Sequence, residues 1–347
     1  MESYDISGER ELLNAENIEK YIQRLEGKHE NIDHIKLSTK TFNEDAAKII
    51  GQEIIKMKNL KKADLSDTIS GLSNEDAQKT LEIFVESLKD HDLNLLDLSD
   101  NALGPEGVEI LKKLIVNKNE LTEILLINDG LSADSCKIIT NIFKETAPMT
   151  LKKLHFHNNM SGNDGAIAIS EALSCTPSLE DFRWSCTRTG EEGALALSRA
   201  LGSLPHLKKL YIGDNYFGES CGDLLYDAIR TMNQLEELIL SDISLEDEGI
   251  QRVLEALIES HAPITKLNLS LNDIDCDILD VMTEFLSQCP TLKELNLAEN
   301  QLTSVGAISI IKALNSYCPQ LESLNINANE IGSKAAQYIV SICYIFL

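Results

Sequence analysis

The pattern L-x-x-L-x-L-x-x-N-x-L recurs along this 347-residue chain and constrains its fold more than any other feature. Successive copies begin between 28 and 33 residues apart. The copies begin at Ile32, Leu60, Leu93, Leu121, Leu151, Leu179, Leu207, Leu235, Ile264, Leu292 and Leu321. A single unit of this length cannot bury its own apolar residues, whereas stacked units can. The spacing therefore predicts a solenoid built from eleven repeats.

The second half of each repeat predicts a helix. The segments 165–173, 193–201, 249–257 and 306–314 are near-copies, with apolar residues at three- and four-residue steps. A strand followed by a helix in each repeat predicts an α/β leucine-rich repeat solenoid of the ribonuclease-inhibitor type, a horseshoe of about eleven βα repeats. We expect residues 1–31 to form an N-terminal cap and residues 32–347 to form the repeat domain, both parts of a single domain. The apolar stretch 338–347 is expected to be the last helix.

The consensus asparagines are expected to have a structural role. A buried amide at this position can satisfy backbone groups where the strand turns away. These residues are Asn101, Asn159, Asn215, Asn272, Asn300 and Asn329. The fourth repeat departs from the pattern, because Asp129 occupies the consensus position and Asn128 stands one residue earlier.

Charge and cysteine usage restrict the function classes. The formal net charge is −25, which disfavours nucleic acid and anionic membrane as partners and favours a protein with a basic surface. The N-terminus has no apolar segment typical of a signal peptide, and the last ten residues are too short to span a bilayer. The eight cysteines are scattered, without a C-x-x-C motif, which favours free thiols inside the cell.

The residue before the consensus asparagine lies in the loop at the carboxyl end of each predicted strand. We call these the ridge positions: Asp67, Asp100, Asn128, Asn158, Cys186, Asp214, Asp242, Leu271, Glu299 and Ala328. Loops at strand ends are a frequent place for function, and this row is mostly acidic in repeats two to eight. The alternative is that aspartate and asparagine are simply good turn residues, and for any single residue that alternative is the stronger one.

Other candidates carry weaker signals. His155 and His157 are expected to point to one face, as a contact patch more than as metal ligands, since no third ligand is evident. Trp184 occupies a core-leucine position and is expected to pack inside. Arg183 and Arg188 are expected to be exposed, as partner contacts or as solvated charges. No phosphate-binding loop, zinc-protease motif or nucleophile arrangement is present, so the sequence offers no active site of its own.

Several motifs together resemble the leucine-rich domain of Ran GTPase-activating proteins, especially the plant form. They are "LDLSDNALGPEGV", "LLINDGLS", "LHFHNNMSGNDGA", "LEDFRWSCTRTGEEGALAL" and "LNLAENQL", and the resemblance runs from about Ser7 to the last repeat. This family accelerates GTP hydrolysis by the small GTPase Ran. An asparagine of the activator holds Ran's own glutamine in place, and no arginine finger is used. The family pattern L-x-L-x-N-[ND]-G places that asparagine at Asn128.

The resemblance implies further expectations. Ran-GTP is the expected partner, alone or together with a Ran-binding protein, and GTP and magnesium are held by Ran, so the chain has no cofactor of its own. Partner contacts are expected at the ridge and around it: Asp67, Asp100, Asp129, His157, Asn158, Arg183, Arg188, Asp214 and Asp242. The expected protein is a monomer in the cytoplasm or at the nuclear envelope, and it acts in nucleocytoplasmic transport without inserting into a membrane.

Two alternatives stay open. The chain could be a pure interaction scaffold, like the ribonuclease-inhibitor type of repeat protein. It could also bind Ran without activating it, because Leu72 stands where family members usually carry an arginine after glycine in the second-repeat loop.

The plant family's targeting domain and the acidic tail of many members have no counterpart in this sequence. The 33-residue spacing between Leu60 and Leu93 places an insertion in the same loop.

Overall fold

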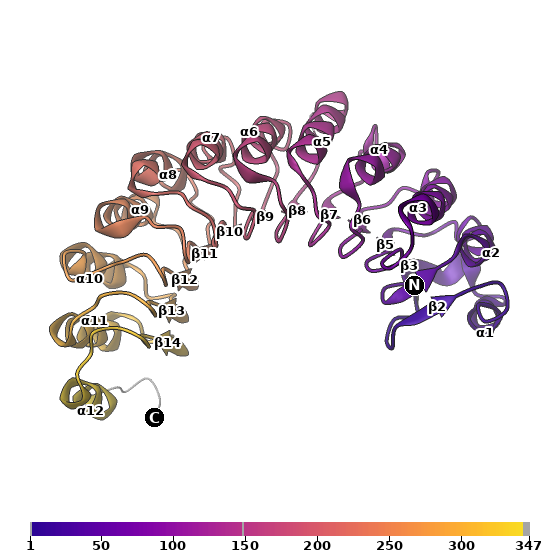
Figure 1. Ribbon diagram of the computed structural model, residues 1–347. Helices are drawn as coiled ribbons and strands as arrows, with labels where there is room; N and C mark the ends of the chain where they lie inside the picture. Colours follow the sequence, from indigo (N-terminus) through magenta and orange to yellow (C-terminus); the bar gives the residue numbers. More distant parts are fainter. Residues whose placement is uncertain (1, 148, 343–347) are drawn as a thin grey trace. The chain divides into compact units, whose positions relative to one another are not determined.

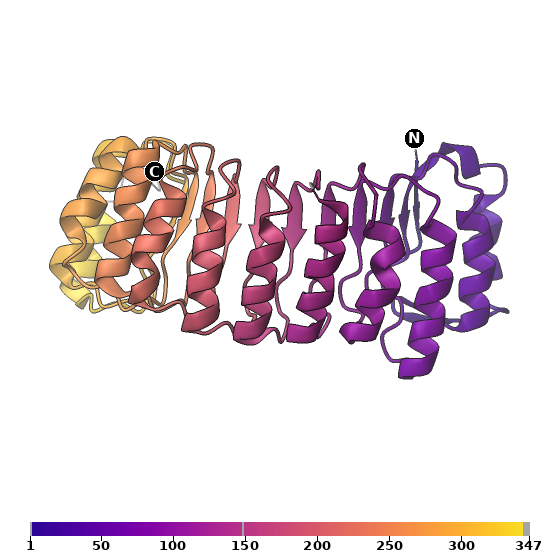
Figure 2. The same ribbon diagram turned by 90° about the horizontal axis from the view of Figure 1, so that it is seen from above.

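The computed structural model describes residues 2–147 and 149–342 as two compact units, Met1–Ser161 and Gly162–Leu347. The sequence predicts no boundary at this point. In each unit, parallel strands form one layer and helices form the other (Figures 1 and 2). We treat the two units separately below.

The first unit contains the cap, the first four repeats and the strand of the fifth repeat. Its strands are β1 (Glu2–Asp5), β2 (Glu11–Leu13), β3 (Ile32–Lys36), β4 (Lys40–Phe42), β5 (Lys62–Asp64), β6 (Leu95–Asp97), β7 (Glu123–Leu125) and β8 (Lys153–His155). Its helices are α1 (Glu19–Ile22), α2 (Glu44–Ile54), α3 (Asn74–Leu88), α4 (Gly104–Ile115) and α5 (Ala133–Thr146), with short 3-10 turns at Gln23–Leu25 and His29–Asn31. The cap joins the repeats through its strands, because β1 pairs with β3 and β2 pairs with β4.

The second unit contains the helix of the fifth repeat and the remaining six repeats. Its strands are β9 (Asp181–Arg183), β10 (Lys209–Tyr211), β11 (Glu237–Ile239), β12 (Lys266–Asn268), β13 (Glu294–Asn296) and β14 (Ser323–Asn325). Its helices are α6 (Gly162–Leu173), α7 (Glu191–Leu201), α8 (Gly222–Ile229), α9 (Glu246–Ser260), α10 (Leu279–Gln288), α11 (Ser304–Tyr317) and α12 (Ser333–Ile342), with a 3-10 turn at Glu219–Cys221. The helices predicted at 165–173, 193–201, 249–257 and 306–314 each lie inside an observed one, and the predicted last helix at 338–347 overlaps α12 as far as Ile342.

The repeat pattern accounts for the core. Ten of the eleven repeat strands in the described residues begin two residues after a predicted start, and β3 begins at its start. The pattern leucines are buried, as Leu96 and Leu98 show in the first unit and Leu207 and Leu210 in the second. Full burial of one such side chain contributes about 1.5–3 kcal/mol. The predicted α/β leucine-rich repeat solenoid is therefore confirmed.

The consensus asparagines connect successive loops. Asn300 shows the arrangement: its Oδ1 accepts from the backbone N–H of Asn272 (3.0 Å), and its Nδ2 donates to the carbonyls of Leu269 and Leu297 (3.1 Å each). Asn101, Asn159, Asn272 and Asn300 are buried as predicted, whereas Asn215 and Asn329 are half-buried. These amides satisfy backbone groups that the strand ends would otherwise leave unpaired.

Trp184 packs in the core as predicted, with no exposed surface, and its Nε1 donates to Thr189 Oγ1 (2.8 Å). Seven described cysteines are free thiols, and Cys343 lies outside the described residues, as does the end of the predicted last helix. Within the described ranges, no helix combines the length and apolar character needed to cross a bilayer.

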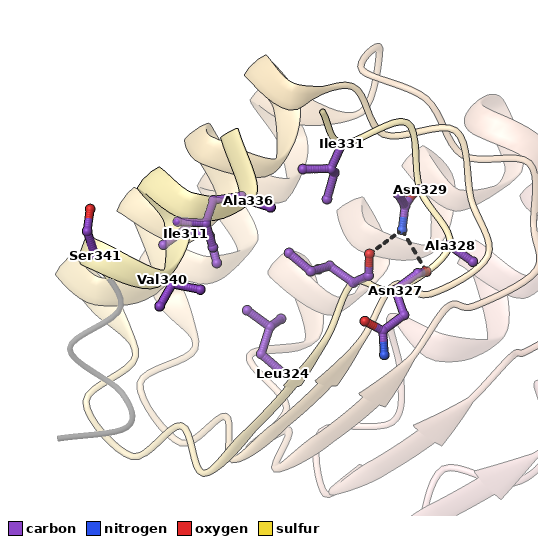
Figure 3. Close-up of a pocket in the computed structure, with 11 residues that line it drawn as sticks. Ile311, Leu324, Asn327, Ala328, Asn329, Ile331, Ala336, Val340 and Ser341 are labelled. Carbon is purple, nitrogen blue, oxygen red and sulfur yellow. Dashed lines mark hydrogen bonds between the residues drawn. The ribbon is translucent and has the colours of Figure 1, made fainter. Parts of the chain in front are cut away.

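The last described repeat leaves an apolar hollow. A cavity of about 640 Å³ lies between β14 and α12 and is lined by Leu324, Ile331 and Val340, among others (Figure 3). In earlier repeats of this unit the next strand and helix pack at the equivalent place. No described residue does so here, which is why Val340 is 77% exposed.

Candidate functional site

Every ridge position has a left-handed backbone, with φ between 53° and 63°. Asparagine and aspartate adopt this conformation more readily than most residues, because their short polar side chains form local hydrogen bonds. The acidic and amide character of the ridge positions therefore has a backbone cause, and composition alone is no sign of a binding site. The side-chain contacts of each residue are needed to distinguish a binding residue from a turn residue.

Three ridge residues of the first unit form a hydrogen-bonded row that we call the amide ladder: Asp100, Asn128 and Asn158. Asn128 Nδ2 donates to Asp100 Oδ1 (2.7 Å), and Asn158 Nδ2 donates to Asn128 Oδ1 (3.0 Å). All three residues are exposed. The ladder holds Asn128 between two neighbours while leaving its outer side open to solvent.

The ladder also determines which way the Asn128 amide points. An ionised carboxylate can only accept hydrogen bonds, so Asp100 must face the Asn128 nitrogen. Asn128 Oδ1 then faces Asn158. Among the described residues, Asn128 Nδ2 makes one side-chain hydrogen bond, to Asp100, and Asn128 Oδ1 makes one, to Asn158. An N–H of Nδ2 and a lone pair of Oδ1 remain, so Asn128 can donate and accept towards a visiting amide at once.

Backbone bonds fix the loop that carries Asn128. The Asn128 N–H donates to the carbonyl of His157 (3.1 Å), and the Asp129 N–H donates to Asn159 Oδ1 (3.0 Å). The left-handed conformation of Asn128, with φ of 56°, is thereby held from both sides. The amide is placed by a rigid loop that joins β7 to α5.

Asp129 does not lie on the surface. Its side chain is completely buried, and Oδ1 accepts from the backbone N–H of Asn101 (2.8 Å). Burial raises the pKa of this carboxyl well above its usual range, and the negative charges of Asp100 and Asp97 raise it further. The prediction that Asp129 contacts a partner is wrong, because the residue occupies the structural position that asparagine holds in other repeats.

Asp67 is likewise buried, with 7% of its surface exposed. Arg10 of the cap forms an ion pair with its Oδ2 and covers it. A partner contact at Asp67 stays a prediction, and it would require Arg10 to move aside from the buried carboxyl. Sequence reasoning missed Arg10, which stands in the "SGER" segment where the family resemblance begins. The Arg10 side chain is 61% exposed, so its positive charge lies on the surface beside Asp67, the first ridge position of this unit.

The histidines of the fifth repeat differ in exposure. His157 is half-buried and its ring centroid lies 6.1 Å from that of His155, so the two share a face as expected. His155 is buried, with 7% exposed, and belongs less to a surface patch. In the described part of the chain, no group of three or more His, Cys, Asp or Glu residues is arranged to hold a metal ion.

The other predicted contacts lie in the second unit. Asp214, Asp242 and Arg188 are exposed. Asp214 Oδ2 accepts from Cys186 Sγ (2.8 Å), and burial followed by this carboxylate raises the pKa of the Cys186 thiol to about 11. Cys186 is therefore a neutral thiol that does not act as a nucleophile at neutral pH.

Arg183 is only half-buried and is held in place. Its Nε donates to Asp181 Oδ1 (3.3 Å), and its guanidinium lies 4.2 Å from the centroid of the Tyr211 ring. Such a stacked arginine is pre-ordered on the strand face and loses little freedom on binding. The expectation that it is a fully exposed charge is corrected, although the side chain still reaches the surface.

The insertion of the second repeat follows β5 and precedes α3, so it lies with the strand-end loops of the first unit. Leu72 is half-buried there, next to Gly71, whose φ of 84° requires the conformational freedom of glycine. The loop is ordered by backbone bonds such as Leu72 N–H to the Ile69 carbonyl (3.3 Å). Order in this loop does not depend on an arginine at position 72.

The repeated strand, loop and helix define this chain as a leucine-rich repeat protein, and a family model described as "Leucine Rich repeat" matches residues 89–112 and 288–310. The backbone is similar to that of an internalin from Listeria monocytogenes, with a TM-score of 0.52 and 14% identity over 91% of this chain and 79% of that one. At this identity the likeness concerns the fold alone.

Sequence similarity leads further. The chain is 30% identical to Ran GTPase-activating protein 1 of Xenopus laevis over 182 residues, which are 49% of this chain and 31% of that protein. It is 35% identical to RAN GTPase-activating protein 1 of Arabidopsis thaliana over 126 residues, 36% of this chain and 24% of that protein. The resemblance to Ran GTPase-activating proteins is thus confirmed, and the matched segment spans less than a third of either relative.

A ribonuclease inhibitor from Mus musculus is also similar, with 26% identity over 228 residues, 65% of this chain and 43% of that protein. This likeness extends over more of the chain at lower identity. It keeps a protein-binding scaffold in consideration as a second candidate function.

Proposed function

We propose that this protein binds the GTP-bound form of the GTPase Ran and accelerates its hydrolysis of GTP. The similarity to Ran GTPase-activating proteins supports the choice of partner and reaction. The observation that carries the proposal is the exposed amide of Asn128, held by Asp100 and Asn158. It stands at the position where the family pattern has its glutamine-holding asparagine.

The chemistry needs a positioned amide and no charge. In GTP hydrolysis a glutamine of the GTPase orients the attacking water, and a mobile glutamine does this poorly. The remaining donor and acceptor of Asn128 match the acceptor and donor of a glutamine amide. Fixing that glutamine lowers the barrier through positioning and electrostatic preorganisation. GTP and magnesium are supplied by Ran, so the chain needs no cofactor of its own.

In the first unit, the proposed partner contacts are the amide ladder and His157. In the second unit, taken by itself, they are Arg183, Arg188, Asp214 and Asp242. Asp100, Asp214 and Asp242 among them suit basic residues on Ran, which speeds encounter and sets orientation. The proposal places the protein in nucleocytoplasmic transport, as a monomer in the cytoplasm or at the nuclear envelope. A Ran-binding protein is a further candidate member of the complex.

A single-turnover GTP hydrolysis assay with Ran tests the proposal. We expect the wild-type protein to accelerate hydrolysis and Asn128→Ala to reduce the accelerated rate by about 100-fold, since misplaced groups cause losses of this size. Asn327→Ala is the matched control, because Asn327 is an exposed loop asparagine of the last repeat. Full activity in Asn128→Ala would refute the role of this residue.

The same assay, combined with a binding measurement, separates the alternatives. The likeness to ribonuclease inhibitor favours a scaffold, which predicts neither Ran binding nor acceleration. A binder that has lost activation, motivated by Leu72, predicts binding without acceleration. In that case Leu72→Arg should restore acceleration.

A further inference from the structure

In the repeats that carry asparagine at the consensus position, this side chain serves as a hydrogen-bond donor as well as an acceptor. In Asn101, Oδ1 accepts from the backbone N–H groups of Thr68 (2.9 Å) and Ile69 (3.1 Å). Its Nδ2 donates to the carbonyls of Leu65 (2.9 Å) and Leu98 (2.7 Å). Asn272, Asn300 and Asn329 donate to backbone carbonyls in the same way. The buried carbonyls at this position therefore face a donor in these repeats.

Asp129 occupies this position in the fourth repeat and, as an ionised group, has no donor to offer. Its side chain is fully buried, and Oδ1 accepts from the Asn101 N–H as an asparagine oxygen would. Oδ2 is buried and has no hydrogen-bond partner among the described residues. An ionised carboxylate here would place an unpaired charge beside carbonyl dipoles of the same sign, which is strongly unfavourable.

Among the described residues, no cation is one of the groups that act on Asp129. The ionisable groups that act on Asp129 from the preceding repeat are Asp97 on β6 and Asp100 in its loop, both of which disfavour a second negative charge. The following repeat carries His155 on β8 and His157 in the loop after it. The pKa of Asp129 is raised well above its usual value, with burial as the largest cause.

We propose that Asp129 is a neutral carboxylic acid in the folded protein at neutral pH, and that its Oδ2–H takes the donor role of the asparagine amide. Protonated, the side chain donates and accepts at once, which an asparagine does and a carboxylate does not. Asp129 then acts as a positioning residue for Asn128. This second part depends on the proposed function, whereas the protonation state does not.

The geometry shows how Asp129 positions its neighbour. Its Oδ1 binds the N–H of Asn101, directly after Asp100, and its own N–H binds Asn159, directly after Asn158. Asp129 thus connects the three loops that carry the amide ladder. Ionisation would drive the side chain away from Asp97 and Asp100 and would disturb the spacing on which the Asn128–Asp100 hydrogen bond depends.

Infrared spectroscopy of the protein without Ran tests the protonation state directly. A protonated carboxyl has a carbonyl stretching band separate from the bands of carboxylates. We expect this band at pH 7 in the wild type and its loss in Asp129→Asn. Asp134→Asn is the matched control, because the Asp134 side chain is 76% exposed and does not occupy a buried position, so that this variant should keep the band. If the Asp129→Asn protein shows the same protonated-carboxyl band as the wild type, the proposal is overturned.

Thermal unfolding across pH gives an independent readout. A carboxyl with a raised folded-state pKa binds more protons folded than unfolded, so stability falls as pH rises from about 4 towards the folded pKa. Asp129→Asn lacks this group. Its melting temperature should therefore rise relative to the wild type between pH 4 and pH 7. A constant difference over this range contradicts a protonated Asp129.

Activation assays then test the positioning role. Asp129→Ala should reduce acceleration of GTP hydrolysis at least tenfold at saturating protein, and Asp129→Asn should restore it, since the amide supplies both hydrogen-bond roles. Equal activity of Asp129→Ala and the wild type overturns the positioning role. If the wild type itself does not activate Ran, the proposed function fails, while the infrared and unfolding experiments still decide the protonation state.

Discussion

At the scale of single residues, one loop position serves different purposes in different repeats. All ridge positions share a left-handed backbone, yet Asn128 is exposed in the amide ladder while Asp67 is buried under Arg10. Next to them, the consensus position fully or partly buries an asparagine amide in six repeats and buries a carboxyl in the fourth. In the fourth repeat, two adjacent polar residues therefore differ in role: Asn128 is exposed, and Asp129 is buried and structural.

Replacing Asn101 tests the structural role of the consensus position. Asn101→Ala should lower the free energy of unfolding by about 3 kcal/mol, because it removes the side-chain partner of the buried Leu98 carbonyl and of the N–H groups of Thr68 and Ile69. Urea denaturation followed by circular dichroism measures the change. The exposed residue Asn327 provides the comparison, and a similar loss in Asn327→Ala would contradict the argument.

At the scale of elements, neighbouring helices complete each other's ends. Helices α2, α3, α5 and α11 each follow a residue whose side chain accepts a hydrogen bond from a backbone N–H of the first turn. Helix α7 begins after Gly190, which has no side chain, and Asn163 of α6 accepts from the N–H groups of Gly190 (2.8 Å) and Gly193 (3.1 Å) instead. Close approach of α6 and α7 makes this borrowed cap possible.

Gly193→Ala should destabilise the second unit by about 1–3 kcal/mol, the usual range for overpacking. A Cβ at this position would lie 2.8 Å from the Cβ of Ala166 and 2.9 Å from the Cα of Asn163. Thermal unfolding monitored by calorimetry checks this. Gly332→Ala should be close to neutral, since its nearest neighbour, Ser304 Oγ, would be 3.6 Å away. A neutral Gly193→Ala would show that the helices separate easily.

At the scale of the whole molecule, charge is the dominant property. The net charge of −25 produces a negative field that favours the approach of a positively charged surface over distances longer than contact. Much of the acidic surface is locally paired, as in the cross-strand pair Lys153–Glu123 (2.6 Å). The exposed residues Asp100, Asp214 and Asp242 have no cation within ion-pair distance among the described residues.

Association with Ran should therefore depend on salt. We expect the association rate constant to fall about tenfold or more between low and high ionic strength, because screening shortens the reach of the protein's field. Stopped-flow fluorescence with labelled Ran measures it. The dissociation rate constant should change much less. An association rate that is independent of salt would remove electrostatic attraction from the proposed function.

The sequence by itself determined the repeat, the order of strands and helices, and the buried set of leucines. A period of 28 to 33 residues places the same kind of residue at the same place in each unit, so stacking follows from local pattern alone. The exposure of Asn128 was also accessible from the sequence, since the residue departs from a consensus position that is otherwise structural.

Only the tertiary structure decided which acidic residues are free. Asp67 is neutralised by Arg10, which is 57 residues away, and Asp129 fills a buried position formed by three successive repeats. The fate of a polar side chain depends on which donors the neighbouring loops bring to it, and the pattern of one repeat does not contain that information. Hydrogen bonds between repeats therefore determine which polar side chains of this protein lie on the surface and which are buried.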